Sequence, residues 1–438
     1  MPLLLVVSLL AADPVAIAPA QVGIDWPEFR GPTHQGHTSG PVPLTWSDRE
    51  NIVWRVPIEG LAWSSPVVDR GDIFLTTATE VDLGHLLRLL VVDLDDGRVT
   101  AEQTLHEQPA GVELVEMHQK NSHASPTPVL ARDAAGRTVV FTHFGPHGTA
   151  AHRWDGRRLE EVWSTQTPPY LSQHGTGGSP ALVGTPEDGT LVICCDGRDE
   201  QFVVGLDAAT GERRWRLDRN LDPDRGFSFG TPLVIEAGGR TLAICTGSSA
   251  VMAIDPESGR EVWRFRYGKG YSVVPRPLWD PDLGERGLLL VSSGFGDRTV
   301  YAIDPSGNGD ITESGLVWSD RKNAPYSPSM LLADGRLYAV SDNGVATARD
   351  AATGRTLWTE RLGGKFSASP LLVCTPGGDR IYWLDEAGTT IVSEAGDEFV
   401  EVARNRIGGG SVRTYASFVP VGGDLLLRTE NELIRIGD

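Results

Sequence analysis

Residues that build covalent or metal frameworks are scarce in this chain, which has four cysteines and ten histidines among 438 residues. No spacing of these residues resembles a zinc site. A disulfide needs Cα atoms within about 7 Å, whereas packed sheets lie about 10 Å apart. We therefore expect all four cysteines to be buried thiols. They are Cys194, Cys195, Cys245 and Cys374.

Basic residues are also in short supply, with 39 Lys and Arg against 58 Asp and Glu and a net charge of −19. No block of Lys or Arg occurs, so we expect no nucleic-acid partner, because such binding depends on neutralising phosphates. No apolar run is long enough to span a bilayer. The apolar start MPLLLVVSLLAA is typical of a signal peptide. We expect a signal peptide at residues 1–20 and a secreted or periplasmic protein.

Repetition, by contrast, is abundant. Eight times a small residue and a proline, or a close variant, open an apolar strand, at steps of 42 to 60 residues. A period near fifty residues with four short strands per unit predicts an all-β, eight-bladed β-propeller. The openings are Ser65-Pro66, Ser125-Pro126, Ser179-Pro180, Thr231-Pro232, Arg276-Pro277, Ser327-Pro328, Ser369-Pro370 and Ser417-Phe418.

A second repeat places an Asp, a Gly and a Trp four residues apart, as in Asp255, Gly259 and Trp263. An Asp-rich turn with Gly at a positive φ reverses the chain, and the following strand carries a large ring that packs on the next blade. In blade five an insertion, residues 306–314, precedes the tryptophan. We expect four such rings to be buried between blades: Trp215, Trp263, Trp318 and Trp358.

The last unit, from Ser417 onward, has only three strands. The missing fourth strand is found near the other end of the chain, in ENIVWRVPI, where Trp54 occupies the place of the other docking tryptophans. We therefore expect residues 21–50 to form an N-terminal extension and residues 51–438 to form the propeller. Closure of the ring by the N-terminal strand removes the exposed sheet edges.

The repeat Ile254-Asp255-x-x-x-Gly259-x-x-x-Trp263, with its copies, resembles the PQQ-like (pyrroloquinoline quinone type) repeat. That repeat builds eight-bladed quinoprotein dehydrogenases and a bacterial outer-membrane assembly factor. The resemblance covers about residues 26 to 438. A nearer likeness, to secreted bacterial PQQ-like propeller proteins, is carried by segments such as WPEFRGP, KNSHASPTP and SDNGVAT. A shared fold does not by itself specify an activity.

The resemblance to quinoprotein dehydrogenases implies a quinone beneath a vicinal disulfide, above a stacking Trp, and beside a calcium ion and a catalytic Asp. Cys194 and Cys195 are vicinal, but they lie inside the strand-like run LVICC, where neighbouring side chains point to opposite faces. The segment that starts at Asp304 begins like a calcium loop but has Gly315 at the twelfth position. We expect neither PQQ nor calcium as a cofactor and no metal site.

One face of the predicted ring is richer in polar residues than the other. The links between blades and the loops between second and third strands emerge on this face, and function concentrates on loops that a rigid scaffold holds. Their imidazole, amide and guanidinium groups suit a polar or anionic ligand. The candidate binding residues are Asn121, His123, His143, His174, Asp196, Arg276, Asp342, Asn343, Lys365 and Arg413.

Two classes of function are consistent with this face. The first is a non-catalytic scaffold that binds a polar or anionic ligand, or an envelope protein, at the channel mouth. The second is an enzyme at the same place, either a quinoprotein-type oxidoreductase or a lyase or hydrolase of an acidic glycan. The roles open to His123, His143 and His174 are structural hydrogen bonding, ligand contact or metal binding. No compact nucleophile–base motif favours the enzyme.

Overall fold

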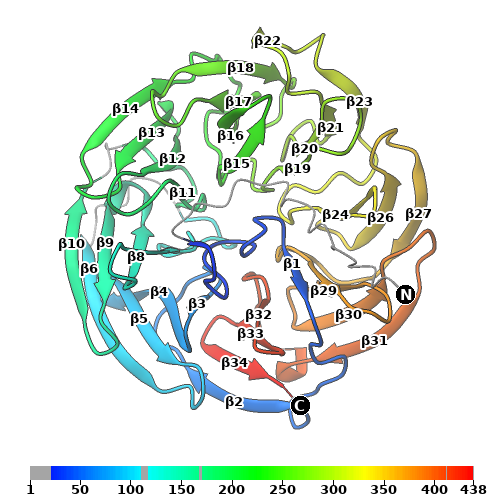
Figure 1. Cartoon of the computed structure of the whole chain (residues 1–438). Coiled ribbons are helices and arrows are strands. Elements are labelled where there is room, and N and C mark those ends of the chain that lie inside the picture. The colour runs from blue at the N-terminus through cyan, green and yellow to red at the C-terminus, as the bar shows by residue number, and fades with distance from the viewer. Residues whose placement is uncertain (1–20, 110–116, 167–169, 411, 438) are drawn as a thin grey trace, which may run out of the picture.

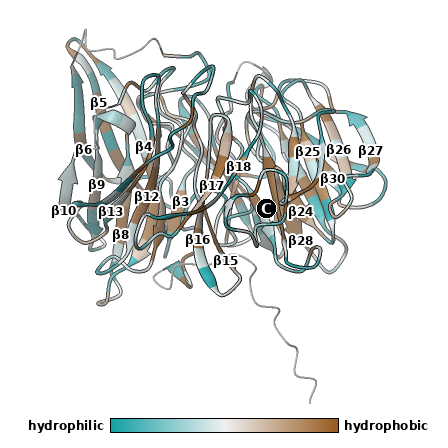
Figure 2. Ribbon diagram, turned by 90° about the horizontal axis from the view of Figure 1, so that it is seen from above, coloured by the Kyte–Doolittle hydropathy of each residue, from teal (hydrophilic) through white to brown (hydrophobic). Residues whose placement is uncertain are grey.

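The computed structural model describes residues 21–109, 117–166, 170–410 and 412–437, so the expected signal peptide lies outside the described residues. The strands form eight four-stranded antiparallel blades around a central channel, which confirms the predicted eight-bladed propeller (Figure 1). The inner strands are apolar and buried, whereas outer strands such as β10 and β27 alternate with polar residues (Figure 2). Within the described residues no helix is long and apolar enough to cross a membrane.

In each blade the strands follow one another from the inner edge to the outer edge of the ring. Blades one to four contain β3 (Val67–Asp69), β4 (Asp72–Val81), β5 (Gly84–Asp93), β6 (Val99–Pro109); β7 (Val129–Arg132), β8 (Thr138–His143), β9 (Thr149–Trp154), β10 (Leu159–Thr165); β11 (Ala181–Val183), β12 (Thr190–Asp196), β13 (Gln201–Asp207), β14 (Arg213–Asp218); β15 (Leu233–Ala237), β16 (Arg240–Gly247), β17 (Ala250–Ile254), β18 (Glu261–Arg266). Blades five to eight contain β19 (Leu278–Asp280), β20 (Leu288–Ser292), β21 (Val300–Ile303), β23 (Leu316–Asp320); β24 (Leu331–Ala333), β25 (Arg336–Val340), β26 (Val345–Asp350), β27 (Thr356–Arg361); β28 (Leu371–Cys374), β29 (Arg380–Leu384), β30 (Thr389–Glu394), β31 (Glu401–Arg406); β32 (Val419–Val421), β33 (Asp424–Arg428), β34 (Glu432–Ile436), β2 (Ile52–Pro57). Two short strands are added at blade edges, β1 (His37–Ser39) and β22 (Gly309–Asp310), and two 3-10 turns are η2 (Gly145–His147) and η3 (Gly408–Gly410).

The ring closes as the sequence predicts. β2 pairs antiparallel with β34, from Ile52 opposite Ile436 to Pro57 opposite Glu432, and so supplies the outer strand of blade eight. The Trp54 indole nitrogen then donates a 2.8 Å hydrogen bond to the Leu94 carbonyl of blade one. The first and last parts of the chain therefore share one sheet, and no blade is left with an open joint.

The Asp–Gly–Trp repeat forms the joint between neighbouring blades. Asp255 Oδ1 accepts hydrogen bonds from the backbone N–H groups of the next turn residues, and Gly259 takes a φ of +72°. A Cβ atom at Gly259 would lie 2.5 Å from the Trp215 ring of the preceding blade. The Trp215 indole nitrogen donates to the Pro256 carbonyl at 2.9 Å. A glycine is therefore required here for two reasons. The turn needs a positive φ, and any side chain would collide with the Trp215 ring.

The insertion in blade five covers the outer edge of blade four. Its strand β22 pairs in parallel with β18, with Gly309 opposite Trp263. Trp263 is 0% exposed as a result. Trp215 is also buried, whereas Trp318 and Trp358 are half-buried, so the predicted interblade position holds for all four rings but full burial does not.

Hydroxyl side chains link the inner strands around the channel. Seven backbone N–H groups, one per blade in all blades except the fourth, donate to the hydroxyl of the next blade at 2.9 to 3.1 Å. We call the hydroxyl groups concerned the hydroxyl ring; blade five has Arg276 in the equivalent place. The ring consists of Ser65, Thr127, Ser179, Thr231, Ser329, Ser369 and Ser417.

The expected openings of blades two and six are wrong by two residues. In the other blades the inner strand begins two residues after the ring position, as β3 begins at Val67 after Ser65. By the same offset, β7 and β24 follow Thr127 and Ser329 rather than Ser125 and Ser327. The error arose because these two links carry a serine–proline pair just before the true ring residue.

The N-terminal extension is part of the propeller. Residues 24–36, which we call the plug, lie across the channel, where Figure 1 shows the dark blue segment at the centre of the ring. Trp26 pairs with Val68 of blade one, and the Gln35 amide makes hydrogen bonds of 3.0 and 3.1 Å with the Trp279 backbone of blade five. β1 then adds in parallel to β28 of blade seven. The plug therefore ties opposite sides of the ring together.

Replacing Trp263 with Ala should lower the free energy of unfolding by about 3–5 kcal/mol, because a fully buried ring leaves a cavity between two blades. Chemical denaturation measures this change. The matched control is Trp318→Ala, which removes an indole ring from a half-buried position between blades. It should lower the free energy of unfolding by clearly less. Equal losses for the two variants would contradict the role assigned to the insertion.

Candidate functional site

A cavity of about 760 Å³ lies in the channel on the side of the links between blades. Phe29 of the plug and six members of the hydroxyl ring line it. The residue two places before each ring position also lines it, in all eight blades. These eight residues are Trp63, Ser125, Gly177, Phe229, Val274, Ser327, Ser367 and Tyr415. The repeat itself therefore builds the wall of the cavity.

Aromatic side chains form a continuous wall on one side of the cavity, which we call the aromatic arc. The arc runs through His174, Phe227, Tyr271, Phe295 and Tyr326, each from the next link or loop around the ring. Successive ring centroids are 5.0, 5.6, 5.5 and 5.3 Å apart, all edge to face. Aromatic faces of this kind pack against flat or cyclic ligands.

Guanidinium groups cover the aromatic rings. Arg225 lies 5.5 Å from the Tyr271 ring centroid, and Arg298 lies 5.6 Å from that of Tyr326. Both arginines line the cavity. Across the cavity, Arg413 lies 5.8 Å from the ring of Trp63. Cation–π contacts hold these charges in place at the mouth.

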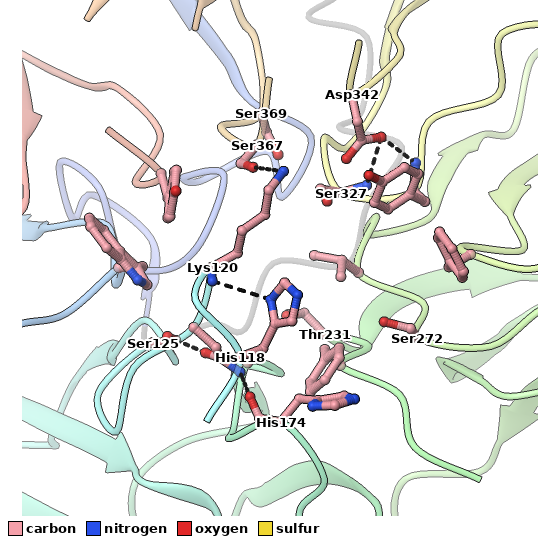
Figure 3. Close-up of a pocket in the computed structure, with 18 of the residues that line it drawn as sticks. His118, Lys120, Ser125, His174, Thr231, Ser272, Ser327, Asp342, Ser367 and Ser369 are labelled. Carbon is pink, nitrogen blue, oxygen red and sulfur yellow. Dashed lines mark hydrogen bonds between the residues drawn. The ribbon is translucent and has the colours of Figure 1, made fainter. Parts of the chain in front are cut away.

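The opposite wall is polar and is tied together by Lys120, as Figure 3 shows. Lys120 comes from the link between blades one and two, yet its ammonium lies 2.6 Å from Glu386 and 3.2 Å from Ser367, both in blade seven. Burial alone would lower the pKa of Lys120, but the hydrogen bond and charge of Glu386 raise it above its ordinary value. Lys120 is therefore a fixed cation that already has a partner.

Asp342 is the one acidic residue among the described residues that line the cavity. Its Oδ2 atom accepts hydrogen bonds from the backbone N–H groups of Tyr326 at 3.0 Å and Ser327 at 3.4 Å. Its Oδ1 atom is buried and has no hydrogen-bond partner. Burial raises the pKa of Asp342, an effect that Ser327 and Lys120 offset only in part.

The imidazole of His118 lies between the two walls, above the channel. Its ring centroid is 5.7 Å from that of His174, and Lys120 lies two residues away in the same link. Burial, together with the nearby His174 and Lys120, lowers the pKa of His118. At neutral pH this side chain therefore offers a neutral ring and adds no further charge to the cavity.

Half of the binding residues expected from the sequence line this cavity. They are Asn121, His174, Asp342, Asn343 and Lys365. Arg413 lies at its edge, where it covers Trp63 and pairs with Glu430 at 2.6 Å. The structure therefore brings these side chains together at the link-side mouth.

Arg276 and Asp196, which we expected at the ligand, are instead structural ion pairs. Arg276 is 0% exposed, lies 2.7 Å from Glu28 of the plug, and donates to the Pro232 carbonyl at 2.7 Å. Asp196 makes a two-pronged ion pair with buried Arg219 at 2.6 and 2.8 Å. The position of the plug explains the first error, since no local pattern showed that Glu28 would meet Arg276.

The three histidines expected to converge do not do so. His174 belongs to the aromatic arc, whereas His123 packs against two other histidines. Its ring centroid lies 4.3 Å from that of His85 and 5.9 Å from that of His147. His143 is buried and hydrogen-bonds Thr149 at 2.9 Å. Six histidines form a histidine cluster between blades one and two. They are His85, His106, His123, His143, His147 and His152. In the part of the chain that the structure describes, no three His, Cys, Asp or Glu residues are arranged to hold a metal ion.

Lys120 and four of the five residues of the aromatic arc were not among the binding residues expected from the sequence, which included only His174 of the arc. For other aromatic residues of the cavity wall, outside the arc, a signal was present in the repeat. Three aromatic residues stand two places before a ring hydroxyl, namely Trp63, Phe229 and Tyr415. An aromatic residue that recurs at one place of a propeller unit faces one shared space, as alternate strand residues do.

The fold and the cavity define an eight-bladed propeller with a ligand-sized channel mouth. A family model described as outer membrane protein assembly factor BamB matches residues 199–331 and 296–398. Two curated relatives match as well, and the aligned regions span 22% and 38% of their lengths. Quinohemoprotein alcohol dehydrogenase ADH-IIG of Pseudomonas putida is 28% identical over 37% of this chain, and BamB of Nitrosomonas eutropha is 24% identical over 40%. The chain is thus a β-propeller whose sequence is similar to proteins of the PQQ-like repeat family.

Solved structures agree on the fold. Quinohemoprotein alcohol dehydrogenase from Comamonas testosteroni superposes with a TM-score of 0.64 at 11% identity, covering 94% of this chain and 80% of that one. BamB from Moraxella catarrhalis gives 0.55 at 13% identity, covering 88% and 96%. At these identities the likeness concerns the fold alone.

The residues of this cavity do not fit the quinone site that the resemblance implies. Cys194 and Cys195 lie in the middle of the buried strand β12, and Cys195 belongs to the apolar core between blades two and three. Neither cysteine lines the cavity. A vicinal disulfide at this place would therefore not cover a ligand in the channel mouth.

Removing the Arg276 charge should destabilise the fold. Arg276→Met leaves Glu28, whose pKa His34 and Arg276 lower to about 2 despite its burial, without its cation. We expect a loss of about 3–5 kcal/mol in the free energy of unfolding, as for other broken buried pairs. Adding Glu28→Leu should restore much of this loss. An Arg276→Met variant with unchanged unfolding would contradict the structural role.

The histidine cluster should make stability depend on pH. Burial lowers the pKa of His106, His123 and His152 to about 4 and that of His143 to about 3. Between about pH 6.5 and 4 the unfolded chain binds protons that the folded chain does not, so stability falls as the pH falls. Thermal unfolding at intervals from pH 7 to 5 measures this slope. His106→Gln with His123→Gln should flatten it, and an unchanged slope would contradict the assignment.

Proposed function

We propose that this chain is an extracytoplasmic, non-catalytic binding propeller whose channel mouth takes a small, ring-bearing ligand with negative charge. The observation that carries the proposal is the aromatic arc with fixed cations beside it, around one cavity. The cavity volume of about 760 Å³ falls in the range of small-molecule sites, roughly 300–1,000 Å³.

Charge supports an anionic ligand. The whole chain carries a net charge of −19, yet the described lining contains four cations of Lys and Arg and a single acid, Asp342. A cleft with one sign of charge in a molecule of the other sign concentrates the matching ligand. The cations are Lys120, Arg225, Arg298 and Lys365.

The proposed location outside the cytoplasm is supported by the apolar leader-like start of the sequence. It is also supported by the match to a family model described as an outer membrane protein assembly factor. The same match favours a protein of the cell envelope as a further partner. That partner would bind a surface other than the cavity, which suits a small molecule.

A second candidate function is acid–base chemistry on an acidic glycan. The observation that favours it is Asp342, a buried carboxyl with a raised pKa and one oxygen without a partner at the cavity wall. Raised carboxyl pKa values in clefts mark candidate general acids. Turnover of polygalacturonate or of a glucuronate-containing polymer by the wild-type protein would favour this candidate over simple binding.

Binding to defined anions tests the proposal. We expect D-glucuronate, D-galacturonate or cyclohexanecarboxylate to raise the unfolding temperature and to bind in calorimetry. Arg298→Ala should weaken binding about threefold to tenfold and reduce its salt dependence, since it removes a cation at the mouth. The matched control is Arg404→Ala, which removes an arginine paired with Glu401 on the outer strand β31.

Three results would contradict the proposed site. The first is that none of the anions binds. The second is that Arg298→Ala binds them with wild-type affinity, and the third is that the two arginine variants have the same affinity for them. PQQ belongs in the same panel because the fold resembles quinoproteins. Dye reduction that depends on added PQQ would instead support the oxidoreductase alternative.

A further inference from the structure

Asp342 is held so that one of its carboxyl oxygens accepts hydrogen bonds from the protein and the other accepts none. The residue is the second of the four-residue loop between β25 and β26, and Figure 3 shows its carboxyl beside Ser327 at the cavity wall. Two backbone N–H groups, of Tyr326 and Ser327, bind the same oxygen, Oδ2. These bonds hold the carboxyl group by Oδ2, and Oδ1 has no hydrogen-bond partner, although the residue is only 6% exposed.

A buried carboxylate oxygen without a donor is costly, and most such atoms in proteins are paired. The cation whose charge acts on Asp342 does not fill this need. Lys120 contributes charge near Asp342, but its ammonium is bonded to Glu386 and Ser367. A donor that arrives with a ligand would therefore recover a hydrogen bond that the protein alone leaves unmade.

The surroundings of Asp342 restrict what that donor can be. The aromatic ring of Tyr326 and the side chains of Asn343 and Lys365 line the same cavity. A ligand ammonium would meet the four cations of the lining and be repelled. A hydroxyl group donates without adding positive charge, so it satisfies Oδ1 and remains compatible with the rest of the wall.

We propose that Asp342 selects the ligand by accepting a hydrogen bond from a hydroxyl group, and that the ligand is an acidic sugar. This inference rests on the proposed function and deepens it. The sugar ring packs against the aromatic arc, its carboxylate meets the lysine and arginine cations, and its hydroxyl meets Oδ1 of Asp342. Each of the three features of the cavity then has a counterpart in one ligand class.

The experiment compares two anions with six-membered rings and one carboxylate, D-glucuronate and cyclohexanecarboxylate, which differ in their hydroxyl groups. In the wild-type protein, calorimetry should show glucuronate binding at least tenfold more tightly. In Asp342→Asn, the amide oxygen should take the two backbone N–H bonds, so the ligand meets a neutral amide. Glucuronate affinity should fall about tenfold, because hydrogen bonds to an ionised acceptor are the stronger ones.

Cyclohexanecarboxylate should respond in the opposite direction. It has no hydroxyl to lose, and removing a negative charge beside its carboxylate should leave its affinity unchanged or raise it. The control variant is Asp297→Asn, which neutralises an acid that pairs with Arg321 and does not line the cavity. It should change neither affinity appreciably.

Two results would overturn the inference while leaving the binding site intact: both anions bind wild type equally well, or both lose affinity equally in Asp342→Asn. If neither anion binds the wild-type protein, the inference falls together with the proposed function. Should Asp342→Asn fail to fold, the wild-type comparison of the two anions decides the question by itself.

Discussion

The contact of a tryptophan in one blade with the glycine turn of the next blade is the interaction on which this ring depends. A single four-stranded blade has two apolar faces and cannot bury both alone. At Trp215 and Gly259 the ring lies where a side chain would otherwise be, and its indole nitrogen is bonded to the same turn. The joint recurs at Trp163 with Gly211, Trp318 with Gly354, and Trp54 with Gly97. Where blade five departs from the pattern, its insertion replaces the contact by laying β22 over Trp263.

The same regular spacing produces the cavity. Because hydroxyl ring residues bond from blade to blade, the residues two places before them are all held at one height around the channel. The chain varies these positions between aromatic, hydroxyl and small residues without disturbing the ring. The plug closes the other side with Phe29, so the cavity opens toward the links. Scaffold and site are thus separate sets of residues within one repeat.

The sequence was a good guide wherever the determinant is local. Blade number, the docking tryptophans and closure by the strand around Trp54 all follow from short patterns that repeat or are missing once. The strand openings at Ser125 and Ser327 were misplaced, because a second serine–proline pair competes with the true ring residue nearby. Arg276 was misassigned for a different reason. Its partner Glu28 lies far away in sequence, and only the path of the plug brings the two charges together.

The candidate site shows the same division. Asp342, Asn343 and Lys365 were found because they lie in loops whose position follows from the propeller topology. Lys120 was not found, since it lies in the link between blades one and two and its partner Glu386 lies far along the chain, in the β29–β30 loop of blade seven. His123 lies in a link and His143 at the end of β8, both on the expected face, but their side chains pack at the joint between blades one and two. The propeller topology determines where a residue lies along the channel axis. The packing of its side chain determines whether it faces the channel.

Closure of the ring by β2 has a consequence for how the chain folds. β2 precedes all four strands of each of blades one to seven along the chain, and its partner β34 follows all of them. Contacts between such distant segments carry a large loop-closure entropy and slow the search for the native state. Until the final blade is formed, the chain holds an unpaired strand and a plug without a channel. Blades can assemble locally in order, but the ring acquires its cooperativity only at the last step.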